Sequence, residues 1–206
     1  IVKNTAENFA HVSLELGGKS PIIIFDDCDI DGAINGIIAG NFGASGQSCV
    51  AGSRVFIQKN IFNRVVSELK DRAKDIVIGN PLDKKTQIGP LATTIQVERA
   101  YNVITNSVKQ GAKLIFGGQS PKHLDEGWYF EPTLLTCPHQ NIDSVKTELF
   151  APVISAISFN TEDDAIQMAN DSKFGLAAGI FTENLARGHR VSEKIHSGIV
   201  WINTYR

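Results

Sequence analysis

The run Pro21-Ile22-Ile23-Ile24-Phe25 restricts the fold of this chain more than any other feature, because every residue in it is apolar. A strand with one face in water alternates apolar and polar residues, whereas a strand buried on both faces is apolar throughout. The run ends at Asp26-Asp27, which gives it the length of a strand rather than of a helix. We therefore expect a strand of a parallel sheet that helices cover on both faces.

Strand and helix patterns alternate along the rest of the chain, and this alternation predicts an α/β fold. We expect three layers, in which a mostly parallel, twisted sheet lies between helices on both faces. The expected helices are 3–9, 32–42, 61–76, 93–110, 161–170 and 184–195, and the expected strands are 11–16, 21–25, 53–58, 113–116, 129–135, 153–159, 176–181 and 199–203. Residues 79–92 are expected to form a loop and residues 117–127 an exposed excursion.

The composition excludes several classes of partner. A chain of 206 residues suffices for one large or two small domains with a sizeable core. The net charge of −2 and the scattered Lys and Arg residues argue against nucleic acid. No apolar stretch near a terminus approaches the roughly 20 residues of a membrane-spanning helix, so no membrane partner is expected. The histidines, including His189 and His196, show no ligand spacing, so no metal site is expected.

The three cysteines, Cys28, Cys49 and Cys137, are sparse and form no Cys-x-x-Cys pair. This pattern argues against a disulfide scaffold or a zinc site and favours a reducing compartment, so we expect a cytoplasmic protein. The chain opens on Ile1 and stops at Arg206, just after a segment with the pattern of a core strand. We therefore expect a fragment of a longer protein.

Cys49 lies in a run of mostly small residues, Gly46-Gln47-Ser48-Cys49-Val50-Ala51-Gly52. A thiol acts as a nucleophile only as the thiolate, and its ordinary pKa is about 8.5. Small neighbours leave backbone N–H groups free to hold an oxyanion, and each such donor lowers the barrier by roughly 2.7–4 kcal/mol. An isolated Cys49 would be read as a small buried hydrophobe. The whole motif favours a nucleophile.

Glu15 lies between Leu14 and Leu16, directly before Gly17-Gly18. On an apolar strand its carboxyl would be partly desolvated, and its pKa would rise toward the range of a general base at neutral pH. Taken alone, the residue would more simply be a Glu that points to water from an edge strand. The separation from Cys49 allows one strand–helix crossover, which can bring the ends of neighbouring strands together.

The segment Thr147-Glu148-Leu149-Phe150 places a carboxylate and an aromatic ring two residues apart. In an extended segment these side chains share a face. Such a pair could hold a hydroxyl-bearing ligand and cover a flat ring, although a solvated Glu and a core Phe are the simpler interpretation from spacing alone.

The segments around Glu15, Cys49 and Glu148 together resemble the motifs of the aldehyde dehydrogenase superfamily, in the same order. The similarity extends through residues 175–181 and 198–203 and covers essentially the whole chain. It implies the fold of the catalytic domain of these enzymes, with residues 1–13 as the end of a cofactor-binding domain and residues 14–206 as a catalytic domain truncated at its C-terminus.

The resemblance also implies roles for individual residues. Cys49 would be the nucleophile and Glu15 the general base that activates the deacylating water. The residues expected to bind the cofactor are Glu148 at the nicotinamide ribose, Phe150 at the nicotinamide end, Gln96 and Arg99 at the adenosine-side ribose, and Leu16 and Gly17 of the glutamate motif. Lys19 and Arg54 belong to the motifs but are expected to be structural ion-pair or surface residues.

The implied activity is oxidation of an aldehyde, a small-molecule substrate, to a carboxylic acid with NAD+ or NADP+, through a cysteine thiohemiacetal and a thioester. The full-length enzyme would be a homodimer or homotetramer. Alternatives are a cofactor-free thiol esterase, an inactive fragment, or an enzyme that passes the acyl group to coenzyme A, against which Glu15 argues mildly. The sequence identifies neither the aldehyde nor the choice between NAD and NADP.

Overall fold

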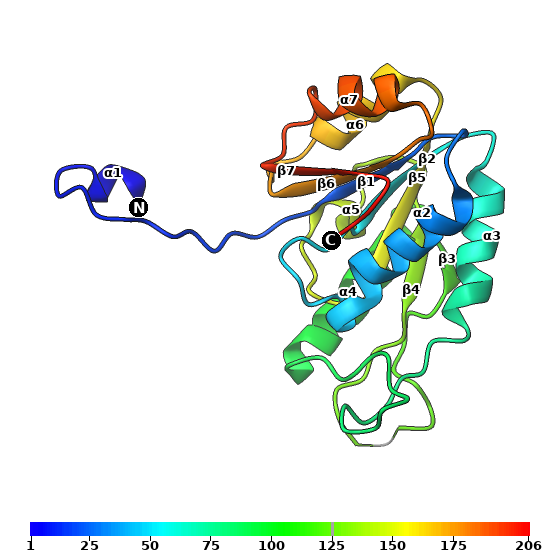
Figure 1. Cartoon of the computed structure of the whole chain (residues 1–206). Coiled ribbons are helices and arrows are strands. Elements are labelled where there is room, and N and C mark those ends of the chain that lie inside the picture. The colour runs from blue at the N-terminus through cyan, green and yellow to red at the C-terminus, as the bar shows by residue number, and fades with distance from the viewer. Residues whose placement is uncertain (125) are drawn as a thin grey trace.

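The computed structural model describes residues 1–124 and 126–206. Its centre is a seven-stranded sheet with the order β3-β4-β5-β2-β1-β6-β7 (Figure 1). All neighbouring strands are parallel except β3 and β4, which pair antiparallel at one edge. The strands are β1 (Pro21–Ile24), β2 (Arg54–Gln58), β3 (Lys113–Phe116), β4 (Thr133–Thr136), β5 (Val153–Phe159), β6 (Ala177–Phe181) and β7 (Ile199–Ile202).

The helices are α1 (Val2–Thr5), α2 (Ile30–Ile37), α3 (Phe62–Ala73), α4 (Thr94–Lys109), α5 (Asp143–Lys146), α6 (Glu162–Asn170) and α7 (Leu185–Ser192). A π-helical turn, η1 (Ile38–Phe42), and a 3₁₀ turn, η2 (Gly43–Gly46), follow α2 directly. The expected excursion 117–127 includes residue 125, which lies outside the described residues.

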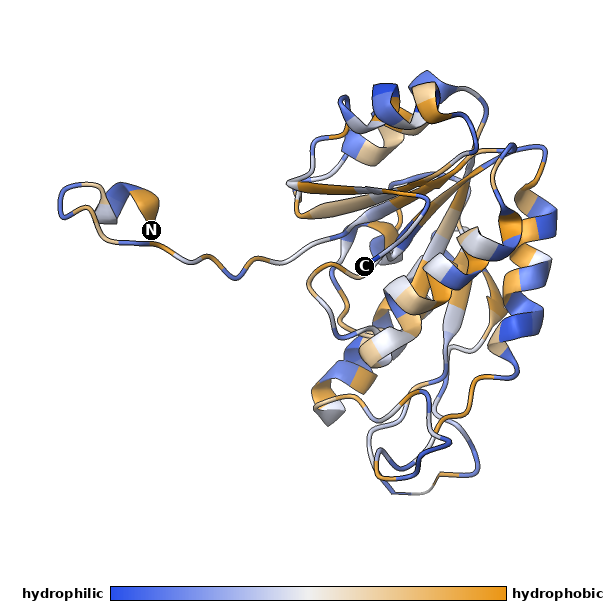
Figure 2. Cartoon of the chain, in the orientation of Figure 1, coloured by the Kyte–Doolittle hydropathy of each residue, from blue (hydrophilic) through white to orange (hydrophobic). Residues whose placement is uncertain are grey.

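Both faces of the sheet are covered, as the apolar run in β1 predicts. Successive strand residues point to opposite faces. Ile23 packs in a core with α4, α6 and α7, whereas Ile22 and Ile24 pack in a second core with α2 and α3. Figure 2 shows the central strands as largely apolar and the covering helices as mixed in polarity. The expected three-layer α/β fold with a mostly parallel sheet is confirmed.

Helix starts follow ordinary capping chemistry, in which a side-chain oxygen accepts from a free backbone N–H. Asp29 caps α2, Thr93 caps α4 and Asn184 caps α7 through such bonds. At α6, Thr161 and Asp164 form a reciprocal capping box. These residues explain why the predicted starts of α4, α6 and α7 lie close to the observed ones.

The predicted strand 11–16 is wrong, because these residues form no strand in the structure. Residues 1–16 instead lead away from the sheet, with α1 at the far end (Figure 1). Phe9 is 92% exposed and Leu16 is 55% exposed. An alternating pattern forms a strand only where a neighbouring strand accepts its backbone hydrogen bonds, and no strand of residues 1–124 and 126–206 pairs with this segment.

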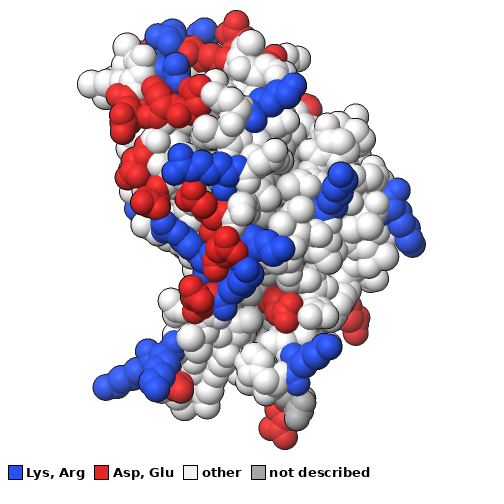
Figure 3. Space-filling model, turned by 90° about the vertical axis from the view of Figure 1, so that its right-hand side faces the viewer, with Lys and Arg blue, Asp and Glu red and all other residues white. Residues whose placement is uncertain are grey.

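The surface shown in Figure 3, on the side of α3, carries basic and acidic side chains that are interspersed. No single sign of charge dominates this face. Among the described residues, no helix combines the length and apolar character that a membrane crossing needs.

A tight left-handed turn precedes Cys49. Ala44, Ser45 and Gly46 have φ angles of 52°, 57° and 73°, a conformation that costs roughly 1–2 kcal/mol for each residue with a side chain. A Cβ on Gly46 would overlap the carbonyl group of Ala151. The turn therefore packs closely against the segment before β5, and the point of closest approach is Gly46.

We expect Gly46→Ala to lower the free energy of unfolding by at least about 1–2 kcal/mol from the backbone conformation alone. Gly43→Ala is the matched control, because Gly43 has a φ of −53° and a Cβ there would meet only an arginine nitrogen at 4.0 Å. Its cost should stay within about 0.5 kcal/mol. Urea unfolding of both variants measures the difference, and equal costs would contradict the packing described here.

Candidate active site

The candidate site lies where the segments that precede four parallel strands meet. Residues 17–20 lead into β1, 46–53 into β2, 147–152 into β5 and 172–176 into β6. Because β1 pairs with β2 and β6, and β2 pairs with β5, the amino ends of these strands lie side by side. The sheet register therefore brings the segments around Glu15, Cys49 and Glu148 (the glutamate, cysteine and Glu148 motifs) to the same end of the parallel strands.

Cys49 is half-buried in a turn that the surrounding backbone holds firmly. The Tyr205 hydroxyl donates to the Val50 carbonyl at 2.7 Å, and the Gly52 N–H donates to the Gly40 carbonyl at 3.1 Å. The backbone N–H groups of residues 48–50 have no hydrogen-bond partner among residues 1–124 and 126–206. They are available to an oxyanion beside the sulfur, as the small-residue motif predicts.

Gly18 brings the glutamate motif into contact with the cysteine motif. A Cβ on Gly18 would lie 2.5 Å from the Cys49 carbonyl oxygen, so only glycine fits there without a shift. The same residue donates its N–H to Glu148 Oε1 at 2.8 Å. One glycine thus touches the loops that carry the expected nucleophile and the expected ribose ligand.

The sequence predicts that Glu15 is partly buried, but the structure shows it exposed. Its side chain is exposed and it belongs to no strand, because the segment before Gly17 leaves the sheet. The partial desolvation expected for the carboxyl is therefore absent here. Glu15 is three residues from Gly18, a span of at most about 11 Å of extended chain, so it stays within reach of the Cys49 loop.

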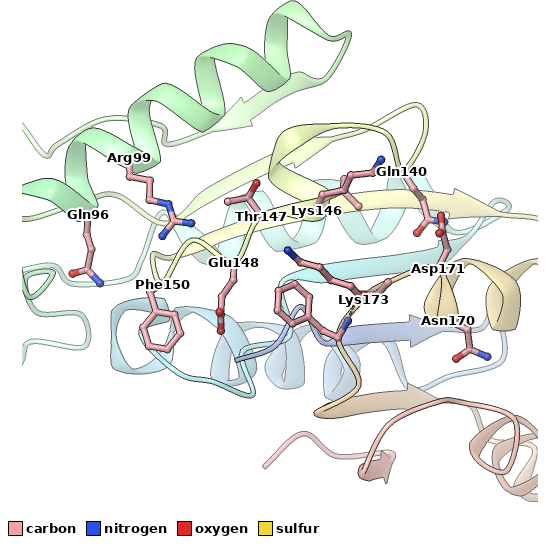
Figure 4. Close-up of a pocket in the computed structure, with 13 residues that line it drawn as sticks. Gln96, Arg99, Gln140, Lys146, Thr147, Glu148, Phe150, Asn170, Asp171 and Lys173 are labelled. Atoms are coloured by element: carbon pink, nitrogen blue, oxygen red, sulfur yellow. Dashed lines mark hydrogen bonds between the residues drawn. The ribbon is translucent and has the colours of Figure 1, made fainter. Parts of the chain in front are cut away.

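A cavity of about 860 Å³ opens beside this edge, and four expected cofactor-binding residues line it: Gln96, Arg99, Glu148 and Phe150. Figure 4 shows Gln96 and Arg99 reaching from α4 toward the segment that carries Glu148 and Phe150. Phe150 has a φ of 52°, so this segment is not the extended one that the i, i+2 argument assumes. Glu148 and Phe150 still line the same cavity.

The other two expected cofactor residues do not line this cavity. Leu16 is exposed at the end of the departing arm. Gly17 is half-buried, and a Cβ on it would overlap the Glu148 carboxylate. Its role in this structure is to let the chain pass close to Glu148.

The residues of the opposite wall of the cavity were not predicted from the sequence. This wall is formed by Gln140 and by residues 170–174, with Asp171 accepting from the Gln140 amide at 3.0 Å. The only available signal was position, since residues 172–176 precede β6 just as the motif loops precede β1, β2 and β5. The oxygen of the Gln96 side chain is buried without a hydrogen-bond partner among the described residues. A buried polar atom of this kind at a cavity wall fits a polar ligand.

Lys19 and Arg54 were expected to be structural ion-pair or surface residues. Both are buried, each 2% exposed, so neither is a surface residue. Arg54 donates to the backbone carbonyls of Lys19, Met168 and Ala169 at 2.7–3.2 Å. Neither cation forms an ion pair within the described residues. Arg54 is a structural residue, as expected, but it acts through carbonyl groups rather than through a carboxylate.

Burial, and next to it the charge of Arg54, lowers the pKa of Lys19 from 10.5 to about 7. Between these two values the unfolded chain holds a proton that the folded chain releases. The free energy of unfolding should therefore rise with pH from about 7 to 10, by up to about 1.4 kcal/mol per pH unit. Lys19→Met should lose this rise, and Lys84→Met, at an exposed position, should keep it. Parallel stability–pH profiles for all three proteins, from urea unfolding, would contradict this prediction.

Comparison with known proteins places these features in one family. A family model described as the aldehyde dehydrogenase family matches residues 1–206. The chain is 52% identical to a (Z)-2-((N-methylformamido)methylene)-5-hydroxybutyrolactone dehydrogenase of Acinetobacter baylyi and 46% identical to a betaine aldehyde dehydrogenase of Brucella anthropi. Each alignment covers 100% of this chain and 42% of the relative, so the chain spans less than half the length of these relatives.

Solved structures show the same fold. A betaine aldehyde dehydrogenase from Staphylococcus aureus in complex with NAD+ superposes with a TM-score of 0.93 at 38% identity, over 100% of this chain and 41% of that chain. An aldehyde dehydrogenase from Bacillus cereus in complex with NAD+ gives a TM-score of 0.92 at 40% identity, over 100% of this chain and 41% of that chain. With the family model matching the whole chain and the fold matching these structures, the chain belongs to the aldehyde dehydrogenase family.

Proposed function

We propose that this chain is the catalytic part of an NAD(P)+-dependent dehydrogenase that oxidises a small aldehyde to a carboxylic acid. The observation that carries the proposal is the arrangement around Gly18, which lies so close to the Cys49 carbonyl that a Cβ would not fit and which donates its N–H to Glu148. This glycine joins a candidate nucleophile with free backbone donors to a polar cavity of about 860 Å³.

Cys49 is the proposed nucleophile. Its thiolate adds to the aldehyde carbon, and the backbone N–H groups of residues 48–50 stabilise the oxyanion of the resulting thiohemiacetal. Loss of a hydride from this adduct leaves a thioester on the sulfur. Splitting the oxidation in this way replaces one difficult step by two easier ones.

Glu15 is the proposed base for the second half-reaction. It removes a proton from a water molecule, the hydroxide adds to the thioester carbon, and the acid leaves as the Cys49 thiolate is restored. The exposed position of Glu15 requires the arm 10–17 to place the carboxylate beside the sulfur. The contact of Gly18 with the Cys49 carbonyl supports this assignment, because it fixes the end of the arm at the site.

NAD(P)+ fits the cavity beside the site. Glu148 would offer a carboxylate to a ribose hydroxyl and Phe150 a ring face. The side-chain oxygen of Gln96, which has no hydrogen-bond partner among the described residues, would accept a hydrogen bond. Arg99, Lys146 and Lys173 add positive charge to the walls, which suits phosphate groups. When bound, the cofactor supplies the acceptor for the hydride.

The wider organisation is also part of the proposal. Residues 1–13 belong to a cofactor-binding domain and residues 14–206 to the catalytic domain; the departure of residues 1–16 from the sheet supports a boundary close to Gly17. We further propose a cytoplasmic homodimer or homotetramer that binds neither nucleic acid nor membrane. The sparse, free cysteines support a reducing compartment.

Cys49→Ala should reduce aldehyde-dependent NADH formation by the natural protein about 10³-fold or more, because the covalent step is lost. Absorbance at 340 nm during turnover measures the rate. Cys28→Ala is the matched control, since Cys28 lies at the carboxyl ends of the strands, just after β1, whereas Cys49 lies at their amino ends. Full activity in Cys49→Ala would end the proposal. Turnover of an activated ester with no oxidation of any aldehyde would favour the thiol esterase instead.

Glu15→Gln should slow hydrolysis of the thioester about 10²-fold or more and leave its formation largely intact. The expected result is one rapid equivalent of NADH followed by slow turnover, with an acyl mass retained on the Cys49 peptide. Glu7→Gln, on the same exposed arm, should behave like the unaltered protein. If Glu15→Gln keeps its steady-state rate, another residue is the base. Release of the acyl group to coenzyme A but not to water would favour an acylating enzyme.

A further inference from the structure

Helix α5 begins without a side-chain cap of its own, and α4 supplies the hydrogen bonds instead. The N-cap residue of α5 is Ile142, whose side chain makes no capping bond. The Asp143 N–H donates to Gln110 Oε1 at 2.8 Å, and the Ser144 N–H donates to Ser107 Oγ at 2.9 Å. The first N–H groups of a helix have no partner within the helix and need an acceptor from elsewhere. Here both acceptors come from the end of another helix.

The bond between Gln110 and Asp143 is reciprocal. While Gln110 Oε1 accepts from the Asp143 N–H, Gln110 Nε2 donates to Asp143 Oδ1 at 2.9 Å. Two hydrogen bonds between the same pair of residues fix their direction as well as their distance. Gln110 is exposed, so this pair joins the two helices at the surface.

Ser144 continues the connection between the helices into the core. Ser107, Ser144 and Ser155 are all fully buried. Ser155 Oγ donates to Ser144 Oγ at 2.9 Å, and Ser107 Oγ donates to the Val103 carbonyl at 2.7 Å. A buried polar network whose members are satisfied makes its surroundings rigid. Helix α5 is therefore bound to α4 on one side and to β5 on the other.

One face of α4 carries both this connection and part of the cavity wall. Gln96 and Arg99, near the start of α4, line the cavity of about 860 Å³ and reach toward Glu148 (Figure 4). About three helical turns, roughly 16 Å, separate Gln96 from Ser107 and Arg99 from Gln110, a spacing that returns to the same face of the helix. Helix α4 is thus a rigid link between the cavity and α5.

The wall that carries Glu148 begins where α5 ends. Residues 145–147 line the cavity, and Glu148 follows them directly. A shift of α5 along α4 would therefore move Glu148 relative to Gln96 and Arg99. The contacts between the two helices set the width of the cavity at this point.

We propose that Gln110 is a positioning residue for the cofactor, because it holds α5 on α4 and so fixes the separation of Glu148 from Gln96 and Arg99. Gln110 is not among the residues that line the cavity. A ligand that contacts two walls binds more tightly when their separation is already fixed, since binding does not then have to order them. This inference rests on the proposed binding of NAD(P)+ in this cavity.

Gln110→Ala in the natural protein should raise the Kd of the nicotinamide cofactor about fivefold or more, because α5 loses its tie to α4. Calorimetry measures the Kd for NAD+ and for NADP+. At saturating cofactor, kcat and the KM for the aldehyde should change about twofold at most, since the Cys49 loop is not altered. Asn102→Ala is the matched control, because Asn102 is an exposed amide of α4 whose side chain forms no hydrogen bond within residues 1–124 and 126–206.

The outcomes separate this inference from the proposed function. An unchanged Kd in Gln110→Ala, or an equal rise in Asn102→Ala, overturns the role of Gln110 and leaves the proposed function in place. If the unaltered protein binds neither NAD+ nor NADP+, the proposed function itself is wrong.

An exchange of partners tests the geometry of the pair. Gln110→Glu places a carboxylate beside that of Asp143, so the Kd should rise at least as much as in Gln110→Ala. Adding Asp143→Asn restores both bonds, because a carboxylate at position 110 accepts from the backbone N–H and from the side-chain amide at position 143. The double variant should return to within about twofold of the unaltered Kd. A double variant that stays as weak as Gln110→Glu contradicts the proposal.

A double-mutant cycle tests whether Gln110 acts through Glu148. Glu148→Ala removes the contact that Gln110 is proposed to position, so a further Gln110→Ala should then raise the Kd less than about twofold. Two residues that act independently would instead show the same rise from Gln110→Ala in both backgrounds. That additive result would mean that Gln110 only supports the structure, and it overturns the inference.

Discussion

The parallel pairing of β2 with β1 and β5 is the constraint on which the candidate site depends. A parallel register brings the starts of neighbouring strands together, so loops far apart in sequence arrive at one edge. The buried guanidinium of Arg54 reinforces this register, because it donates from the first residue of β2 to the carbonyl of Lys19, just before β1, and to the end of α6. The contact of Gly18 with the Cys49 carbonyl follows from that alignment. The parallel register of the sheet thus sets the position of the candidate site.

Most of the fold was predictable because its signals are local. The apolar run of β1 and the caps Thr93, Thr161 and Asn184 act within a few residues, and the corresponding elements were expected close to where they lie. What the sequence could not predict is which strands pair with one another and in which direction. Residues 11–16 alternate like a strand but have no neighbouring strand in the described part of the chain, and β3 joins the sheet antiparallel, a direction that its own residues do not encode.

The site shows the same division. Glu148, Phe150, Gln96 and Arg99 line one cavity, but the φ of 52° at Phe150 shows that the segment from Glu148 to Phe150 is not extended, as the spacing argument had assumed. Burial was the property that residue type could not supply. A carboxylate flanked by leucines was expected to be partly desolvated, and Lys19 to be a structural ion-pair or surface residue. Glu15 is instead exposed, and Lys19 is 2% exposed with no ion pair among the described residues. Tertiary packing decides the environment of each charge, and no local pattern reports it.

The position of the site departs from the general tendency of open α/β sheets to bind ligands at the carboxyl ends of their strands. At that edge, polar groups are used within the protein: Asp27 accepts from Thr182 and from the Asn184 N–H and pairs with Arg187. At the amino edge, the N–H groups around Cys49 and the oxygen of Gln96 have no partner among the described residues. Polar groups without a protein partner are free to bind a ligand or water, and a buried one such as the Gln96 oxygen costs free energy until it does, so the amino ends of the strands are the better candidate for a binding site. In this chain the unpaired hydrogen-bonding groups favour a candidate site at the amino ends of the strands, whereas strand topology alone favours the carboxyl ends.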